Sequence, residues 1–151
     1  MLNDDYKEML QCLNAEGVDY LLIGAYAMAA HGFPRATMDI DIWVKPSPEN
    51  AKAVWKALQR FGAPLGQIAV EDFTNDDIIF QIGVAPRRID IITGVSALNF
   101  DETISRAIEV HVEGLKVLIP SVSDLITNKK ATGRIKDLAD VETLESLSDK
   151  I

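Results

Sequence analysis

The pattern of apolar and polar positions along the chain predicts five helices. They are expected over residues 4–14, 25–30, 48–61, 123–132 and 134–148. Start and stop signals support these limits. Ser47 and Pro48 supply an N-cap followed by proline at the first helical position, and Ser123 is expected to cap the fourth helix. Gly62 and Gly133 follow the third and fourth helices, where glycine commonly ends a helix.

Short apolar or alternating runs predict six strands. They cover residues 18–23, 38–44, 78–82, 88–92, 108–112 and 117–119. Alternation is clearest in the second run, where the apolar residues share one face and Asp39, Asp41 and Trp43 share the other. The last two runs are expected to form a hairpin around Glu113 and Gly114, a common turn sequence.

This order of elements predicts a mixed α/β (α+β) domain with a helical C-terminal end. The chain has 151 residues, a length typical of one domain. We therefore expect a single domain over residues 1–151. Its core is expected over about residues 1–120, followed by C-terminal helices at about residues 123–148.

Composition narrows the class of protein. Apolar residues make up 48% and charged residues 25% of the chain, which is normal for a globular protein and unlike a disordered one. The net charge of −8 disfavours broad non-specific binding to nucleic acid, although an anionic substrate held through metal ions is compatible with it. Cys12 is the only cysteine, so an internal disulfide is excluded. Its side chain is expected to be buried. Without a membrane span or a signal peptide in this sequence, we expect a cytoplasmic protein that does not bind membranes.

Three carboxylates in predicted strands are the strongest chemical signal. Asp39 and Asp41 lie two residues apart, so their side chains point the same way and are about 6–7 Å apart. Asp90 lies between isoleucines, where a carboxylate is rare unless it is paired or bound to metal. Carboxylate oxygens suit Mg²⁺. Three of them could hold two cations for phosphoryl chemistry if the two strands are neighbours.

Each of these carboxylates also has a structural explanation. Asp39 and Asp41 fit a solvated face of an amphipathic strand. Asp90 fits an ion pair with Arg87 or Arg88. The junction at Gly24 is similarly open to two interpretations: a strand leading through glycine into a helix can hold a phosphate, but most such glycines form ordinary turns.

The ordered set of these motifs resembles the DNA polymerase β-like nucleotidyltransferase superfamily. The set consists of Leu22-Ile23-Gly24-Ala25, then Asp39-Ile40-Asp41, and later Asp90. The stretch from Gly24 to Asp41 and the tail from Asp124 to Asp140 more narrowly resemble its AbiE-type branch of nucleotidyltransferase-like toxins and small relatives. The resemblance implies a nucleotidyltransferase fold with a mixed central sheet flanked by helices.

The resemblance also implies roles for individual residues. Asp39, Asp41 and Asp90 would be catalytic and bind two Mg²⁺ ions, with Mn²⁺ as an alternative, and Asp90 would help to deprotonate the acceptor. The nucleotide-binding residues would be Gly24, Ala25, Arg35, Thr37 and Lys129. Ala25 departs from the family pattern, because serine or glycine usually follows the glycine. The alternative to nucleotide binding is a solvated loop for Arg35 and Thr37 and an exposed helix face for Lys129.

Three functions follow from these observations. The first is transfer of a nucleoside monophosphate from a nucleoside triphosphate to a hydroxyl acceptor such as an RNA end, in a toxin–antitoxin-type system. The second is a non-catalytic binding module that works with a partner protein or as a homo-oligomer, because Ala25 departs from the family pattern and this sequence is shorter than those of larger relatives, which carry an extra helical domain for the acceptor. The third is transfer to a small aminoglycoside-like compound, which the negative charge would favour.

Overall fold

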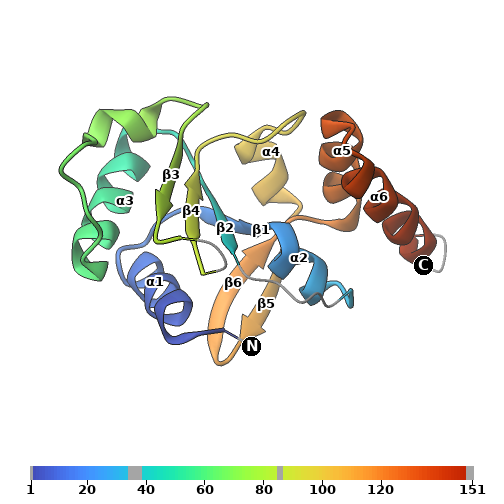
Figure 1. The fold of residues 1–151 in the computed structure, drawn as a ribbon, viewed down its shortest axis with the longest axis horizontal. Coiled ribbons are helices and arrows are strands. Elements are labelled where there is room, and N and C mark those ends of the chain that lie inside the picture. The colour runs from blue at the N-terminus through green and yellow to red at the C-terminus, as the bar shows by residue number, and fades with distance from the viewer. Residues whose placement is uncertain (1, 34–38, 85–86, 149–151) are drawn as a thin grey trace.

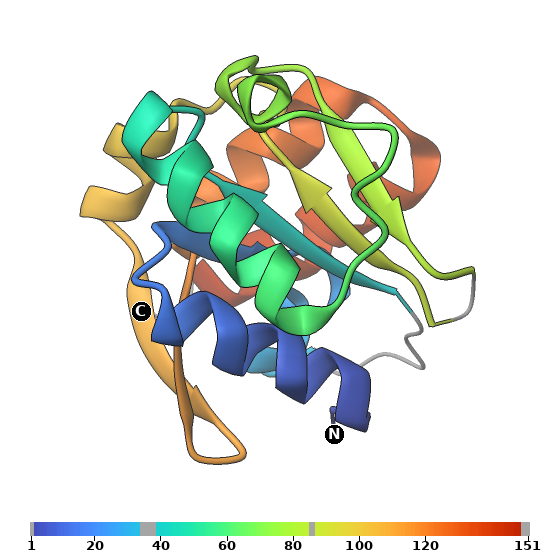
Figure 2. The ribbon, with the colours of Figure 1, turned by 90° about the vertical axis from the view of Figure 1, so that its left-hand side faces the viewer.

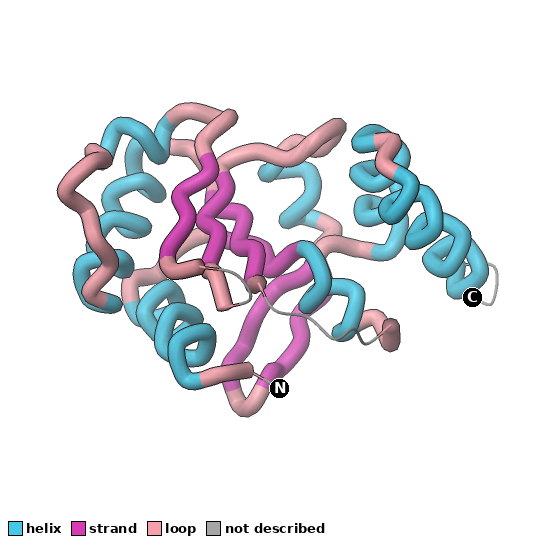
Figure 3. Tube along the Cα trace, viewed as in Figure 1, coloured by secondary structure: helices cyan, strands magenta, loops and turns pink. Residues whose placement is uncertain are grey.

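In a computed structural model, the protein consists of a central sheet flanked by helices (Figure 1). The structure describes residues 2–33, 39–84 and 87–148, excluding the side chains of 147 and 148. Its elements are α1 (Asp4–Ala15), β1 (Tyr20–Ile23), α2 (Gly24–Ala30), β2 (Ile40–Val44), α3 (Pro48–Phe61), the 3₁₀ helix η1 (Val70–Thr74), β3 (Ile79–Ile82), β4 (Ile89–Ile92), α4 (Phe100–Ser105), β5 (Ile108–Val112), β6 (Leu115–Ile119), α5 (Val122–Thr132) and α6 (Ile135–Ser148). Figure 3 shows the strands at the centre with helices on both sides. This is the predicted mixed α/β architecture.

The main sheet has four strands in the order β1-β2-β4-β3. β2 and β4 are parallel, whereas β1 and β3 run antiparallel to their neighbours, so the sheet is mixed as predicted. The register aligns residues of all four strands in rows. One row is Ile23, Asp41, Asp90 and Gln81, and the next row on the same face is Leu21, Trp43, Ile92 and Ile79. A carboxylate row therefore lies beside an apolar row.

Helices α1 and α3 cover one face of the sheet, as Figure 2 shows. Side chains from these helices and from β2 share one apolar core and have no exposed surface. They include Met9, Leu10, Leu13, Ile40, Ile42, Val44, Val54 and Leu58. The alternation of β2 is the reason for this core, because every second side chain of the strand points toward the helices.

The opposite face carries a second, smaller core. Leu21, Trp43 and Phe100 form it, and the rings of Trp43 and Phe100 pack edge to face with centroids 5.1 Å apart. Trp43 is only 1% exposed. The solvated face considered for Asp39 and Asp41 therefore does not extend to Trp43, because α4 covers this part of the strand.

The C-terminal helices α5 and α6 pack against each other on the side of the sheet opposite α3 (Figures 1 and 2). Arg106, just after α4, donates two hydrogen bonds to the buried carboxylate of Asp124 in α5, at 3.0 and 2.9 Å. This ion pair ties the helical end to the rest of the domain. Within the described residues, no helix is long and apolar enough to span a membrane.

Two details of the predicted elements need correction. The N-cap of α5 is Ser121, not Ser123, because the Ser121 hydroxyl accepts a hydrogen bond from the backbone N–H of Asp124 at 3.1 Å. Helix α4 and η1 were not predicted. Both are short, and aromatic packing of Phe100 on Trp43 and of Phe73 on Phe80 supports them rather than helical periodicity in the sequence. The remaining helices, the six strands and the hairpin agree with prediction within a few residues.

Candidate active site

The three predicted carboxylates come together at the centre of the sheet. Asp41 of β2 and Asp90 of β4 are directly paired in the parallel register, and Asp39 immediately precedes β2. Asp90 is 6% exposed, whereas Asp39 and Asp41 are partly exposed. The condition that the sequence could not test is therefore met: the two strands are neighbours.

Gly24 lies against the carboxylate of Asp41. A Cβ atom at position 24 would overlap Asp41 Oδ2, and the backbone of Gly24 has a φ of +68°. Both the space and the conformation favour glycine. The first residue of α2 is thus held close to the carboxylates, and Ala25 follows it in the wall of the same cleft.

Arg88 binds two of the three carboxylates. Its Nε donates to Asp90 Oδ1 at 2.7 Å and its guanidinium to Asp90 Oδ2 at 3.2 Å. The same guanidinium is 3.2 Å from Asp39 Oδ2. The backbone N–H of Arg88 also donates to Asp39 Oδ1, at 3.1 Å. The predicted ion pair of Asp90 with an arginine is confirmed, and the pair with Asp39 was not predicted. Strand alternation explains why the partner is Arg88 and not Arg87, because Arg88 and Asp90 are two residues apart and lie on the same face.

Burial and the crowding of negative charge raise the pKa of Asp41. Desolvation, followed by the charge of Asp90 and a hydrogen bond to it, raises the pKa of Asp41 from 3.8 to about 6. Asp39 raises this pKa further, and Arg88 opposes the rise. A carboxylate whose ionised form is disfavoured by its neighbours is a common feature of functional sites.

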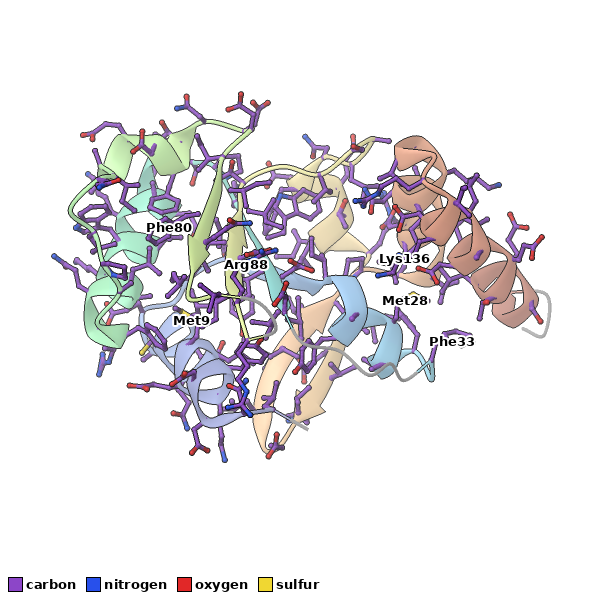
Figure 4. The ribbon with its side chains drawn as sticks, in the orientation of Figure 1. Met9, Met28, Phe33, Phe80, Arg88 and Lys136 are labelled. Atoms are coloured by element: carbon purple, nitrogen blue, oxygen red, sulfur yellow. The ribbon has the colours of Figure 1, made fainter. Side chains whose placement is uncertain are left out.

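The carboxylates open into a cleft of about 730 Å³ between the sheet and the C-terminal helices. Figure 4 shows Arg88 on the strand side and Lys136 on the side of α6, and both line the cleft. Four acidic and four basic side chains among the described residues line it: Asp39, Asp41, Asp90 and Asp137, with Arg88, Lys129, Arg134 and Lys136. The cleft is therefore formally neutral, although the chain carries −8.

Lys129 lies in the cleft wall but is held by two aspartates of α6. Its Nζ is 2.9 Å from Asp140 Oδ2 and 3.5 Å from Asp137 Oδ1, and its side chain is 12% exposed. Burial alone would raise the pKa of Asp137, but hydrogen bonds from Thr132 and Arg134 and the charge of Lys129 lower it below its ordinary value. Arg134 also contacts Asp137, with its Nε 2.8 Å from Asp137 Oδ2. Lys129 is thus part of an ion network that joins α5 to α6.

Other predicted residues have simpler outcomes. Arg35 and Thr37 lie outside the described residues. His31 lies at the end of α2, with its Nε2 2.9 Å from the carbonyl oxygen of Pro120. Cys12 is buried in α1, as predicted. Lys136 lines the cleft but was not predicted, because its place there depends on the packing of α6 against α5.

The donor set of the cleft fits a divalent cation in its chemistry. Carboxylate oxygens from Asp39, Asp41 and Asp90 are the hard ligands that Mg²⁺ and Mn²⁺ prefer. A cation would also relieve the repulsion that raises the pKa of Asp41. In the described part of the chain, however, no three His, Cys, Asp or Glu side chains are gathered as a ready metal cluster. The carboxylates must therefore rearrange if they are to share a metal.

Comparisons with known proteins agree with this architecture. A profile of the family described as "Nucleotidyltransferase of unknown function (DUF6036)" matches residues 1–151. No curated protein matches the chain. The chain is similar in structure to a proposed nucleotidyltransferase from Thermotoga maritima, with a TM-score of 0.57 and 15% identity over 100% of this chain and 97% of that one.

At that identity the structural likeness shows a shared fold alone. The narrower resemblance to the AbiE-type branch stays a prediction. The family match covers the whole sequence. The chain therefore belongs to the nucleotidyltransferase family of unknown function, DUF6036.

Proposed function

We propose that the protein transfers a nucleoside monophosphate from a nucleoside triphosphate to a hydroxyl acceptor, with divalent cations held by Asp39, Asp41 and Asp90. One observation carries the proposal: two neighbouring parallel strands present these carboxylates together in a cleft, beside the glycine that begins α2. Membership of a nucleotidyltransferase family supports it at a coarser level.

Bound cations would neutralise triphosphate charge and favour ionisation of the acceptor hydroxyl. The protein's own residues would position the reactants. Gly24 and Ala25 bring backbone into the cleft next to Asp41, and this cleft of about 730 Å³ has room for β- and γ-phosphates. Arg134 and Lys136 add positive charge on the opposite wall. Arg35 and Thr37 remain predicted phosphate contacts. Lys129 would help to bind the nucleotide either while it is paired with Asp137 and Asp140 or after these ion pairs break.

The transfer step follows from this arrangement. The acceptor oxygen attacks the α-phosphorus and forms the new P–O bond. The bond from the α-phosphorus to the oxygen that bridges to the β-phosphate breaks, and pyrophosphate leaves with the electron pair. Asp90, the most deeply buried of the three carboxylates, accepts the hydroxyl proton. Positioning and charge stabilisation would provide most of the rate enhancement.

A second candidate is a non-catalytic nucleotidyltransferase-like module. It is favoured by the ion pairs of Arg88, which occupy carboxylates expected to bind metal, and by Ala25, which lacks the hydroxyl common in relatives. In this case the cleft would bind an anionic ligand or a partner segment without transfer. A partner from a toxin–antitoxin-type pair would then be needed for function.

Calorimetric titration with each nucleoside triphosphate, with and without Mg²⁺, separates the two candidates. We expect Mg²⁺-dependent binding that is lost in Asp39→Asn and Asp41→Asn and retained in Asp77→Asn, which removes an exposed carboxylate outside this cleft. Incorporation of an α-labelled triphosphate into RNA or into small hydroxyl compounds then identifies the acceptor. Asp41→Asn should lower that transfer by about a thousandfold without loss of fold. Binding without transfer to any acceptor class would favour the non-catalytic module.

A further inference from the structure

Arg88 has the most unusual position among the charged residues of the cleft. Its guanidinium contacts Asp90 at 2.7 and 3.2 Å and Asp39 at 3.2 Å, so one cationic group bridges carboxylates from two strands. The backbone carbonyl of Arg88 accepts a hydrogen bond from Ile40 N–H at 3.0 Å, which fixes its main chain beside the start of β2. The side chain can move while this anchor stays in place.

The guanidinium and a divalent cation need the same oxygens. Mg²⁺ binds carboxylate oxygens at about 2.0–2.1 Å, and two positive groups cannot both approach Asp39 and Asp90 so closely without strong repulsion. This competition accounts for the lack of a ready three-ligand cluster in the described part of the chain. Asp39 and Asp90 are directed toward Arg88 instead of toward one point shared with Asp41.

We propose that Arg88 is a built-in competitor of the divalent cation, and that its guanidinium must leave Asp39 and Asp90 before the cation binds. This inference rests on the metal site of the proposed function but adds a residue to which no role in metal binding was assigned. Arg88 would lower the affinity of the nucleotide-free protein for metal. A triphosphate that arrives with its own cation would offer the displaced guanidinium a new anionic partner.

The surroundings of Arg88 allow this displacement. Its side chain is 30% exposed and faces the cleft, so it can swing into open space without disturbing the core (Figure 4). Asp90, by contrast, has a side chain that is only 8% exposed. A buried carboxylate strongly disfavours the loss of its counter-ion, so removal of Arg88 should leave Asp90 in need of another cation.

The test is a titration of nucleotide-free protein with Mn²⁺, followed by the electron paramagnetic resonance signal of the free ion. Arg88→Gln should bind Mn²⁺ about ten- to a hundredfold more tightly than wild type, the range typical of residues that contact metal ligands. Arg88→Lys, which keeps the charge but loses the forked geometry, should lie between the two and provides a second variant if Arg88→Gln folds poorly. Arg87→Gln is the matched control, because it removes the same charge from an exposed neighbouring residue.

Equal or weaker Mn²⁺ binding by Arg88→Gln would overturn the proposal, as would an equal gain in Arg87→Gln, which would indicate a general charge effect. The transfer assay on wild type decides the proposed function separately. If wild type is active and Arg88→Gln has the Mn²⁺ affinity of wild type, only the proposed role of Arg88 is rejected. An inactive wild type with tighter binding in the variant retains that role and rejects the transfer.

Discussion

The two faces of the central sheet are built by the same strands but have opposite properties. Under α1 and α3, Ile40 and Ile42 have no exposed surface and belong to the large apolar core. On the other face, Asp41 lies in an open cleft, while Trp43 of the same strand is buried against Phe100. One face is uniformly apolar, and the other changes from carboxylates to aromatic packing within a single strand.

This difference separates stability from chemistry. Side chains on the covered face make apolar contacts, so substitutions there should lower the free energy of unfolding. The open face crowds negative charge and raises the pKa of Asp41, so it should decrease the stability of the ionised protein. Functional sites commonly retain such unfavourable groups, and the rest of the fold compensates for them.

The largest expected effect is on the covered face. Ile42→Ala removes a fully buried side chain from the central strand and should lower the free energy of unfolding by about 4 kcal/mol. Urea denaturation followed by circular dichroism measures this change. The neighbouring substitution Asp41→Asn should show no such loss. A loss below about 1 kcal/mol for Ile42→Ala would contradict close packing on this face.

The second expected effect concerns the wall of the open cleft. Lys129→Met leaves the buried carboxylates of Asp137 and Asp140 without their shared partner and should destabilise the protein by about 3 kcal/mol. The control is Lys130→Met, since the exposed pair of Lys130 with Glu145 contributes about 0–1 kcal/mol. Thermal unfolding of both variants provides the comparison. Equal melting temperatures would instead leave Lys129 free for a nucleotide-binding role.

The third expected effect tests the contact between Gly24 and Asp41. Gly24→Ala places a Cβ atom against the carboxylate and should destabilise the protein by about 2 kcal/mol more than the backbone conformation alone requires. Gly17→Ala is the matched control, because Gly17 has a φ of +66° and open space around its Cβ position. Chemical denaturation of both variants isolates the contact. Equal losses would mean that Asp41 moves aside freely.

The smallest expected effect is a pH dependence of stability in the presence of a chelator. The carboxyl group of folded Asp41 retains its proton up to about pH 6, whereas the unfolded chain releases it near 3.8. The folded state therefore binds more protons between these values, and its stability falls as the pH rises through this window. Asp41→Asn should match wild type below pH 4 and be the more stable protein above pH 6, by less than the full value of the shift because water screens this partly exposed carboxylate. Parallel curves for the two proteins would contradict the raised pKa.

Local pattern predicted much of this molecule because helices and strands depend on periodicity and caps. The alternation of β2, the capping of α3 by Ser47 and the hairpin at Glu113 all follow from neighbouring residues. Helix α4 did not follow in the same way, because Phe100 gains its stability from Trp43, more than 50 residues away in sequence. The N-cap of α5 was missed by two residues because two serines offered similar signals.

The site shows the same division. The sequence by itself determined which carboxylates share a strand face, since Asp39 and Asp41 are two residues apart and the side-chain period of a strand is two. Only the tertiary structure decided that β2 and β4 are parallel neighbours, which brings Asp90 beside Asp41. It also decided that Arg88 bridges Asp39 and Asp90 and that α6 holds Lys129. The contacts of Asp41 with Asp90 and of Arg88 with Asp39 each join residues 49 positions apart in sequence, and no local pattern specifies which strands pair or which charges meet across them.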